Sequence, residues 1–324
     1  SLRSFEHIGV QRFRLPEGLS VEEALGVFKG DPDVEYAEPN YYYQINLIPN
    51  DPLFNNLWGL LNTGQTGGTA DADIDATEAW DITTGNGKVV VAVIDSGVDF
   101  THGDLSGNIW RNLGEIEGNS FDDDGNGFVD DVRGWDFVLN RNNVSDVLGH
   151  GTHVAGTIAA MGNNGTGVSG VSWNAKIMAL RFADAGGSGL TTDAISAINY
   201  ANAKGAHIIN LSWGGNSSSL ALKDAIDASS ALVVCSAGNS GRDIDTTPYY
   251  PASYSSANII AVAATDEDDN LAGFSNYGIT GVDVGAPGVN IYSCAPGNAY
   301  AYEDGTSMAA PHVSGLAALL QGRN

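Results

Sequence analysis

Four polar side chains stand at the ends of apolar segments, and together they could catalyse the hydrolysis of an acyl group. Asp95 ends one apolar run, and Asn239 follows another. His150 and Ser307 each open a helical pattern. A nucleophile, a general base, an orienting carboxylate and an oxyanion donor are the parts that acyl transfer to water requires. Each residue alone could be an ordinary cap or turn residue, so only the set predicts catalysis.

The stretch around Ser307 predicts a nucleophile at the start of a buried helix. A glycine turn at Gly305 leads into an Ala-rich run that extends to Leu320. At a helix N-terminus the unpaired N–H groups and the helix dipole favour the negative charge of an oxyanion. Pro311 lacks the N–H group that would bond to the carbonyl of Ser307, so we expect an irregular first turn. A serine that only caps a core helix is the alternative for this stretch.

Alternating apolar runs and helical patterns predict an α/β domain in three layers, with a mostly parallel sheet flanked by helices. The continuous β-branched runs are typical of strands that are buried on both faces. Parallel sheets bind their ligands at the carboxyl ends of the strands, which is where the four polar residues fall. Strands are expected at 89–94, 176–180, 207–211, 231–235 and 258–262, and helices at 150–161, 191–203 and 218–229.

Residues 1–45 form a small α+β segment that differs from the rest. An alternating strand is expected at 8–15, a capped helix at 20–28 and a second strand at 34–40. So short a segment buries little core of its own, and we expect it to pack on the larger domain. The sequence therefore predicts two domains, 1–45 and 46–324.

The composition is strongly acidic, with 14 Lys and Arg residues against 39 Asp and Glu residues and a net charge of −25. Nucleic-acid and membrane-surface binders need a basic face, so these partners are not expected. The acidity suits a secreted monomer and favours cation binding. Cys235 and Cys294 lie in apolar contexts, where two buried thiols are expected and a single disulfide is the alternative.

An acidic loop predicts a calcium site. Its carboxylates and amides fall at positions 1, 3, 5 and 9 of an EF-hand-like pattern, with a glycine nearby at the turn. Arg133 stands where an EF-hand carries its closing glutamate, so Asp131 or a residue from elsewhere must complete the site. The merely solvated acidic loop is the alternative. The candidate ligands are Asp122, Asp124, Asn126, the Phe128 carbonyl, Asp130 and Asp131.

Three motifs carry a family resemblance: Asp95-Ser96-Gly97, His150-Gly151-Thr152-His153 and Gly305-Thr306-Ser307-Met308-Ala309-Ala310-Pro311. Their order, Asp, His, Ser, is that of the subtilisin arrangement. Residues 47–320 resemble subtilisin-family serine endopeptidases, and especially the thermitase-like members.

The resemblance implies a role for each residue of the set. Ser307 would be the nucleophile, His150 the general base and Asp95 the carboxylate that orients it. The Asn239 amide and the Ser307 N–H group would form the oxyanion hole. His153 is the structural histidine beside His150, and a zinc site is disfavoured because the HExxH spacing is absent. A neutral His150 should make activity rise through about pH 6–8.

The resemblance also implies where a peptide would bind. Two segments would pair with its backbone by strand addition, giving broad specificity with an apolar or aromatic P1 residue. A narrow processing protease is the alternative, for which Asp184 and Asp193 are the nearby acids. The implied contacts are Ser188, Gly189, Ser212, Trp213 and Gly214.

A second calcium site and a propeptide are implied by the resemblance alone. Residues 1–45 resemble the second half of an inhibitory and chaperone propeptide, with the mature enzyme beginning near Asn46 or Leu47. The sequence thus suggests a secreted, calcium-dependent endopeptidase. A non-enzymatic calcium-binding or adhesive protein on the same scaffold is the alternative. The implied ligands of the second site are Asp51, Asp104, the Asn164 side chain and the carbonyls of Met161, Thr166 and Val168.

Overall fold

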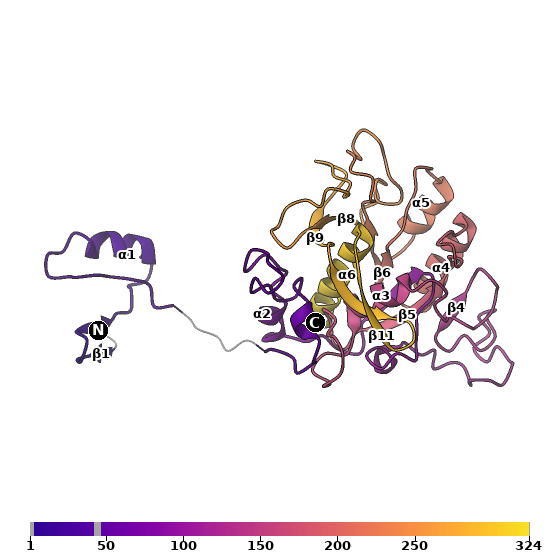
Figure 1. The fold of residues 1–324 in the computed structure, drawn as a ribbon, viewed down its shortest axis with the longest axis horizontal. Coiled ribbons are helices and arrows are strands. Elements are labelled where there is room, and N and C mark those ends of the chain that lie inside the picture. Colours follow the sequence, from indigo (N-terminus) through magenta and orange to yellow (C-terminus); the bar gives the residue numbers. More distant parts are fainter. Residues whose placement is uncertain (1–2, 42–46, 324) are drawn as a thin grey trace. The chain divides into compact units, whose positions relative to one another are not determined.

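The computed structural model describes residues 3–41 and 47–323 of the chain (Figure 1). The chain divides into two compact units, Ser1–Ile45 and Asn46–Asn324. Asn46, where maturation was expected, lies outside the described residues.

The N-terminal unit contains one hairpin and one short helix. β1 (Arg3–Phe5) pairs antiparallel with β2 (Val10–Arg12), and α1 (Val21–Phe28) follows. Ser20 and Glu23 form a capping box, in which each side chain accepts the other residue's backbone N–H group. Among residues 3–41 only Ala24 is buried, so the unit has little core of its own. The strand predicted at 34–40 is wrong, because these residues pair with no other strand in the described part.

A seven-stranded sheet forms the centre of the second unit, and every pair of neighbouring strands is parallel. In spatial order the strands are β4 (Gly134–Asp136), β5 (Lys176–Arg181), β3 (Val90–Asp95), β6 (Ile208–Leu211), β7 (Leu232–Ser236), β8 (Ile259–Thr265) and β9 (Val284–Pro287). The five predicted strands correspond to β3, β5, β6, β7 and β8, with small shifts at their ends.

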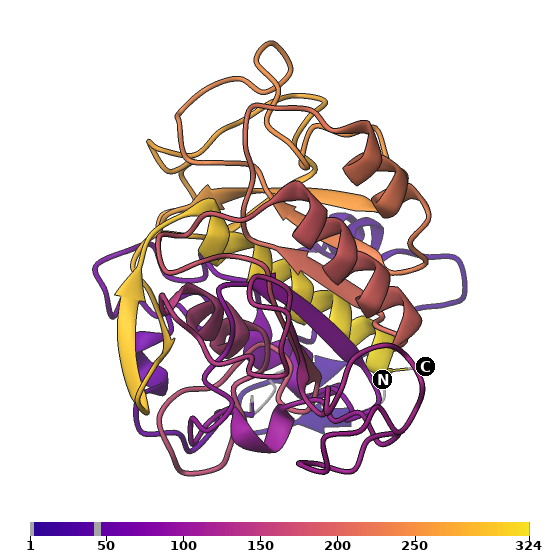
Figure 2. The same cartoon turned by 90° about the vertical axis from the view of Figure 1, so that its right-hand side faces the viewer.

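Helices cover both faces of the sheet, which confirms the three-layer prediction (Figures 1 and 2). The helices are α2 (Ala76–Trp80), α3 (His150–Ala159), α4 (Thr191–Ala203), α5 (Leu220–Asp227) and α6 (Thr306–Gly322), with short 3₁₀ turns at Phe54–Asn56 and Ser106–Asn108. Every residue of the apolar run in β3 is buried, because the strand faces a layer of helices on each side of the sheet. Val91 and Val93 belong to the core cluster that includes α3 and α6, while Ala92 and Ile94 belong to the cluster that includes α4 and α5.

An antiparallel hairpin that the sequence did not indicate packs on α3. It consists of β10 (Ile291–Ala295) and β11 (Ala299–Glu303), which leads directly into the turn before α6. His153 Nε2 lies 2.9 Å from the carbonyl of Ile291, and Ser293 donates its hydroxyl to the His153 carbonyl at 2.8 Å. Through these contacts with His153, the hairpin holds α3, the helix that begins with His150, in place. No described helix combines the length and the apolar character that a membrane span needs.

Candidate active site

Asp95 and His150 meet at the carboxyl edge of the sheet. Asp95 is the last residue of β3, and His150 is the first residue of α3. The His150 Nδ1–H group donates to both carboxylate oxygens of Asp95, at 2.8 Å and 2.9 Å. The Asp95 side chain is 5% exposed and the His150 side chain 25%. This hydrogen bond leaves Nε2 as the unprotonated nitrogen of a neutral His150, which is the form that can accept a proton.

Two neighbouring groups bring α3 close to the strand end. A Cβ on Gly151 would overlap the carbonyl oxygen of Gly97, so only glycine allows this approach. Ser96 Oγ accepts the Gly151 N–H group at 3.0 Å and donates to Asp146 at 2.8 Å. Asp146 also accepts the N–H group of Thr152 at 2.8 Å, as an N-capping carboxylate does. Sequence reasoning missed Asp146, because its importance comes from its contacts with Ser96 and Thr152 and no motif marks it.

The charges around His150 strongly favour its protonated form. Burial lowers the pKa of His150, but the adjacent Asp95 carboxylate outweighs burial through its charge and its hydrogen bond. The charges of Glu303 and Asp146 add to this effect, and the pKa rises to about 9. The sequence expectation of a rise in activity through about pH 6–8 used the ordinary imidazole pKa. The charges of these three carboxylates, two of which lie on other segments, favour a rise at higher pH.

Ser307 is the second residue of α6, and its backbone is held by a group from the neighbouring strand end. Because Pro311 has no N–H group, the Ser307 carbonyl has lost its helical donor. Ser212 Oγ replaces that donor at 2.8 Å. In return, the Ser307 hydroxyl donates to the Ser212 carbonyl at 2.9 Å. Between the described residues no hydrogen bond joins Ser307 to His150, and such bonds are often loose in unbound enzymes.

Asn239 lies beside the start of α6, with its amide oriented by Thr306. The Asn239 Oδ1 atom accepts the N–H group of Thr306 at 2.9 Å and its hydroxyl at 2.8 Å. Its Nδ2–H₂ group is consequently left as a donor. A Cβ on Gly305, which has φ 154°, would lie 3.2 Å from Asn239 Nδ2 and 3.5 Å from Ser307 N. The missing side chain therefore leaves space beside Asn239 Nδ2 and Ser307 N, the two groups that the resemblance implies as oxyanion donors.

The other histidine of the motif has a structural environment. His153 is fully buried and contacts the carbonyls of Ile291 and Ala301 through Nε2. Burial lowers the pKa of His153 to about 4, so the ring is neutral. Among the residues that the structure describes, no carboxylate bonds to His153 as Asp95 bonds to His150.

The expected substrate-binding residues lie on two stretches of backbone, one of them exposed and the other partly buried. Ser188 and Gly189 belong to an exposed turn in which Asp184 accepts the N–H groups of Gly186 and Ser188. These hydrogen bonds lower the pKa of Asp184 and use its carboxylate within the turn.

The second stretch follows β6 and includes Ser212, Trp213 and Gly214. Gly214 is exposed, whereas Trp213 packs its ring 4.5 Å from that of Phe182. Trp213 Nε1 donates to the Ile94 carbonyl at 2.8 Å, which anchors the segment on the sheet.

Two buried carboxylates form the first candidate metal site. Asp51 is 4% exposed and Asp104 is fully buried, and no ion pair among the described residues includes either. Asp51 accepts the N–H groups of Asn163 and Asn164, and Asp104 accepts the Asn164 side chain at 3.1 Å and the Val168 N–H group at 2.9 Å. Buried carboxylates without a cation are unfavourable, so this site fits a bound cation.

The acidic loop forms a second cluster, with a member that the sequence did not indicate. Ligand atoms of Glu115, Asp124 and Asp131 lie within 4.8 Å of one another. The structure does not bring Asp122 and Asp130 into this group, although both lie in the same loop, where they accept backbone N–H groups. Glu115 is thus a candidate for the missing closing ligand.

A lysine ammonium shares this second cluster. Lys204 Nζ lies 2.5 Å from Asp124 Oδ2 and 3.7 Å from Asp131 Oδ2. The Tyr200 hydroxyl donates to Asp131 at 2.6 Å, and Asn126 donates to the same oxygen at 2.9 Å. The cluster is therefore partly neutralised by the protein's own cation.

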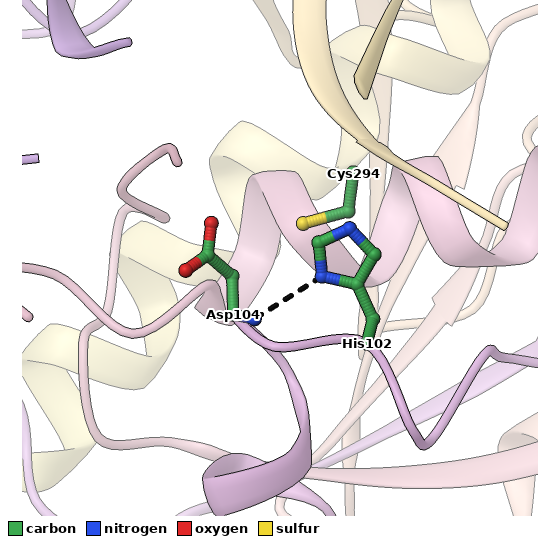
Figure 3. A group of neighbouring side chains, drawn as sticks. All are labelled: His102, Asp104 and Cys294. Carbon is green, nitrogen blue, oxygen red and sulfur yellow. Dashed lines mark hydrogen bonds between the residues drawn. The ribbon is translucent and has the colours of Figure 1, made fainter. Parts of the chain in front are cut away.

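Both cysteines are free and buried, which confirms the thiol prediction. Cys294 lies beside His102 and Asp104 in a fully buried group (Figure 3). His102 uses both ring nitrogens, because Nδ1 accepts the Asp104 N–H group at 3.1 Å and Nε2 donates to the Ala299 carbonyl at 2.9 Å. Burial raises the pKa of Cys294, so its thiol is neutral and packed against the ring.

Comparison with known proteins identifies the family. The subtilase family matches residues 86–324, and the fervidolysin N-terminal prodomain matches residues 1–40. A thermophilic serine proteinase from Bacillus sp. (strain AK1) is 43% identical over 311 residues, covering 94% of this chain and 68% of the relative. Thermitase from Thermoactinomyces vulgaris is 42% identical over 281 residues, covering 85% of this chain and 87% of the relative.

Subtilisin Savinase from Lederbergia lenta is 42% identical over 244 residues, covering 74% of this chain and 78% of the relative. The family match spans most of the second unit, and the prodomain match spans most of the first. These findings confirm the resemblance seen in the motifs. The chain belongs to the subtilase family of serine endopeptidases and carries a prodomain before its catalytic part.

Proposed function

We propose that this chain is a secreted, calcium-stabilised serine endopeptidase of broad specificity, acting as a monomer, with Asp95, His150 and Ser307 as its triad. One observation carries the proposal: the Asp95–His150 pair and the Ser307–Asn239 donor pair occupy the same carboxyl edge of the parallel sheet. Ligands of such sheets bind at this edge.

Each residue of the site has one step in the reaction. The Ser307 hydroxyl turns from the Ser212 carbonyl toward His150 Nε2 and attacks the peptide carbonyl as His150 takes its proton. His150 then gives this proton to the leaving amine. Asp95 keeps Nδ1 protonated and stabilises the imidazolium without becoming protonated itself. Water repeats the sequence on the acyl-enzyme and releases the second product.

The developing oxyanion is stabilised between Asn239 Nδ2 and the Ser307 N–H group. Thr306 holds the Asn239 amide through two hydrogen bonds, so the donor needs no reorganisation during the reaction. The helix N-terminus of α6 adds a favourable field at the same point.

The substrate backbone is recognised by strand addition to the exposed segment 187–189 and to the partly buried segment 212–214, in which only Gly214 is exposed. Main-chain hydrogen bonds do not depend on side-chain identity, so this mode supports broad specificity. The carboxylate of Asp184 is used within its own turn, which disfavours the narrow dibasic alternative. The P1 residue would enter beside Gly214, for which the resemblance implies an apolar or aromatic side chain.

Calcium is proposed at both acidic sites, as a structural rather than a chemical component. Asp51, Asp104 and Asn164, with carbonyls of the loop 161–168, would hold one ion. Glu115, Asp124 and Asp131 would hold the other after Lys204 moves aside. Hard oxygen donors of this kind suit Ca²⁺, and each ion would neutralise negative charge that is costly to bury.

The prodomain is proposed as an intramolecular inhibitor and folding aid that is removed near residue 46. The test follows the full chain in Ca²⁺ by gel electrophoresis and by hydrolysis of an unfolded protein. We expect the chain to shorten by the prodomain and to gain activity, whereas Ser307→Ala stays at full length and inactive. A chain that shortens equally in Ser307→Ala, under conditions that exclude other proteases, would contradict the proposal.

A further inference from the structure

An aromatic ring occupies the space into which a P1 side chain must point. A substrate whose scissile oxygen lies between Asn239 Nδ2 and Ser307 N would place its P1 side chain near two glycines, because one of them precedes Asn239 and the other lies two residues after Ser212, which bonds Ser307. Gly214 lies on the segment after β6, and Gly238 lies just before Asn239, after β7. These segments follow neighbouring parallel strands, so a P1 side chain would enter between them.

The Tyr249 ring touches both walls of this gap. A Cβ on Gly214 would overlap Tyr249 Cε1, and a Cβ on Gly238 would lie 2.8 Å from the same atom and 2.9 Å from Cδ1. One edge of one ring is thus in contact with both glycines. The glycines leave room for this ring, and little room remains for another side chain.

The Tyr249 segment is held against the pocket wall by its backbone. The neighbouring Tyr250 exchanges two hydrogen bonds of 2.8 Å with Gly215, directly beside Gly214. The Tyr249 N–H group donates to Ser253 Oγ at 2.9 Å, and the Ser253 N–H group donates back to the Tyr249 carbonyl at 2.8 Å. The backbone therefore cannot withdraw the ring without breaking these hydrogen bonds.

Arg242 covers the ring from another side. Its guanidinium lies 5.8 Å from the Tyr249 ring centroid and is itself anchored by a hydrogen bond to Asn216. A cation over an aromatic face is attractive and restrains rotation of the ring. Burial raises the pKa of Tyr249, so its hydroxyl is neutral and adds no charge that could attract a basic P1 residue.

We propose that Tyr249 is the specificity-determining residue of this enzyme and restricts the P1 position to small side chains, namely those of Gly, Ala and Ser. This inference rests on the proposed function, because it uses the oxyanion site to place the substrate. It replaces the sequence expectation of an apolar or aromatic P1 residue. That expectation followed from the small residues of the wall at 212–214 and did not include a ring from residue 249.

The test compares peptides that are identical except for Gly, Ala, Leu or Phe at P1, cleaved by the full chain in Ca²⁺. We expect kcat/KM for the Ala peptide to exceed that for the Phe peptide by about tenfold or more, since a pocket rejects what it cannot fit. Tyr249→Gly should raise the ratio of kcat/KM for the Phe peptide to kcat/KM for the Gly peptide by about tenfold or more. Tyr249→Phe is the matched control, because it keeps the ring and should keep the wild-type profile.

The outcomes distinguish a failure of the P1 inference from a failure of the proposed endopeptidase function. Cleavage of the Phe peptide by the wild-type chain as fast as the Ala peptide would overturn the inference, and this comparison needs no variant that could fail to fold. A folded Tyr249→Gly variant that still rejects Phe would overturn it as well. If no peptide is cleaved and a small fluorophosphonate leaves Ser307 unlabelled, the proposed function itself has failed.

Discussion

Raising the pH should switch the enzyme on over an unusually alkaline range, because a protonated His150 cannot accept the serine proton. The Asp95 carboxylate, with Glu303 and Asp146, raises the pKa of His150 to about 9 against the opposing effect of burial. With that pKa about 1% of the molecules carry a neutral His150 at about pH 7, and half do so at about pH 9. We therefore expect kcat/KM to rise about 50-fold between these two values.

The assay measures kcat/KM for a neutral peptide with a small P1 residue from about pH 6 to about pH 10 in saturating Ca²⁺. Proton NMR of His150 in the Ser307→Ala variant gives the same pKa without turnover. A plateau already reached near about pH 7.5, or an imidazole that titrates near its ordinary value of about 6.5, would refute the electrostatic reasoning.

Glu303→Gln separates the electrostatic effect from the hydrogen bond to Asp95. Glu303 is partly buried on β11, and its charge favours protonated His150. Removing that charge should move the alkaline rise in kcat/KM to lower pH and leave the plateau value unchanged. The matched control is Glu117, whose carboxylate pairs with Arg111 and Arg133 in the acidic loop region, and Glu117→Gln should leave the profile in place.

The same pKa predicts how stability depends on pH. Because the folded-state pKa lies above the unfolded value, the Asp95–His150 pair stabilises the fold fully below about pH 6.5. This stabilisation, on the order of 3 kcal/mol, is lost as the pH rises through about 9. Activity and this part of the stability therefore change in opposite directions.

Three further predictions concern the oxyanion donor, the start of α6 and the metal sites. Asn239→Ala should lower kcat by about 10²–10³ with little change in KM, because this is the loss in kcat when a related enzyme loses one oxyanion donor. A variant with unchanged kcat and a raised KM would contradict the role of Asn239. Ser212→Ala removes the hydroxyl that donates to the Ser307 carbonyl, which has no helical donor because of Pro311. This variant should lower the free energy of unfolding, measured in urea, by about 1–3 kcal/mol. The control Ser217→Ala, at an exposed position, should change it very little. Calcium at a hundredfold excess over its dissociation constant should add about 2.7 kcal/mol of stability. Lys204→Met removes the ammonium group that pairs with Asp124 and Asp131, so it should lower the melting temperature in EDTA and increase the stability gained from calcium. The control Lys223→Met disrupts the surface pair with Asp227 and should respond to calcium like the wild type. A melting temperature that does not change when EDTA is added would contradict the proposal that calcium stabilises this protein.

The central sheet could be predicted from the sequence because its strands are buried on both faces. Runs such as the one ending at Asp95 are apolar at every position, and no helix or loop pattern competes with them. The short strands β4 and β9 and the hairpin β10–β11 lack such runs, so they were missed. The strand predicted at 34–40 fails for the opposite reason, because local propensity does not provide a pairing partner.

The catalytic candidates could be found because each one ends or begins an element and belongs to a recognisable motif. Glu115, Asp146 and Tyr249 could not be assigned in this way, because their importance comes from what they contact in three dimensions. Glu115 precedes the acidic loop and folds back onto it. Tyr249 lies in a segment without a motif, and only its contacts with Gly214 and Gly238 reveal its position.

The most direct test of the central claim is to label the folded, calcium-loaded chain with a small fluorophosphonate and to locate the adduct by mass spectrometry of its peptides. We predict one adduct, on Ser307, which is absent in Ser307→Ala and greatly slowed in His150→Ala. A folded chain that acquires no adduct on Ser307, or one whose labelling is indifferent to His150→Ala, would contradict this claim.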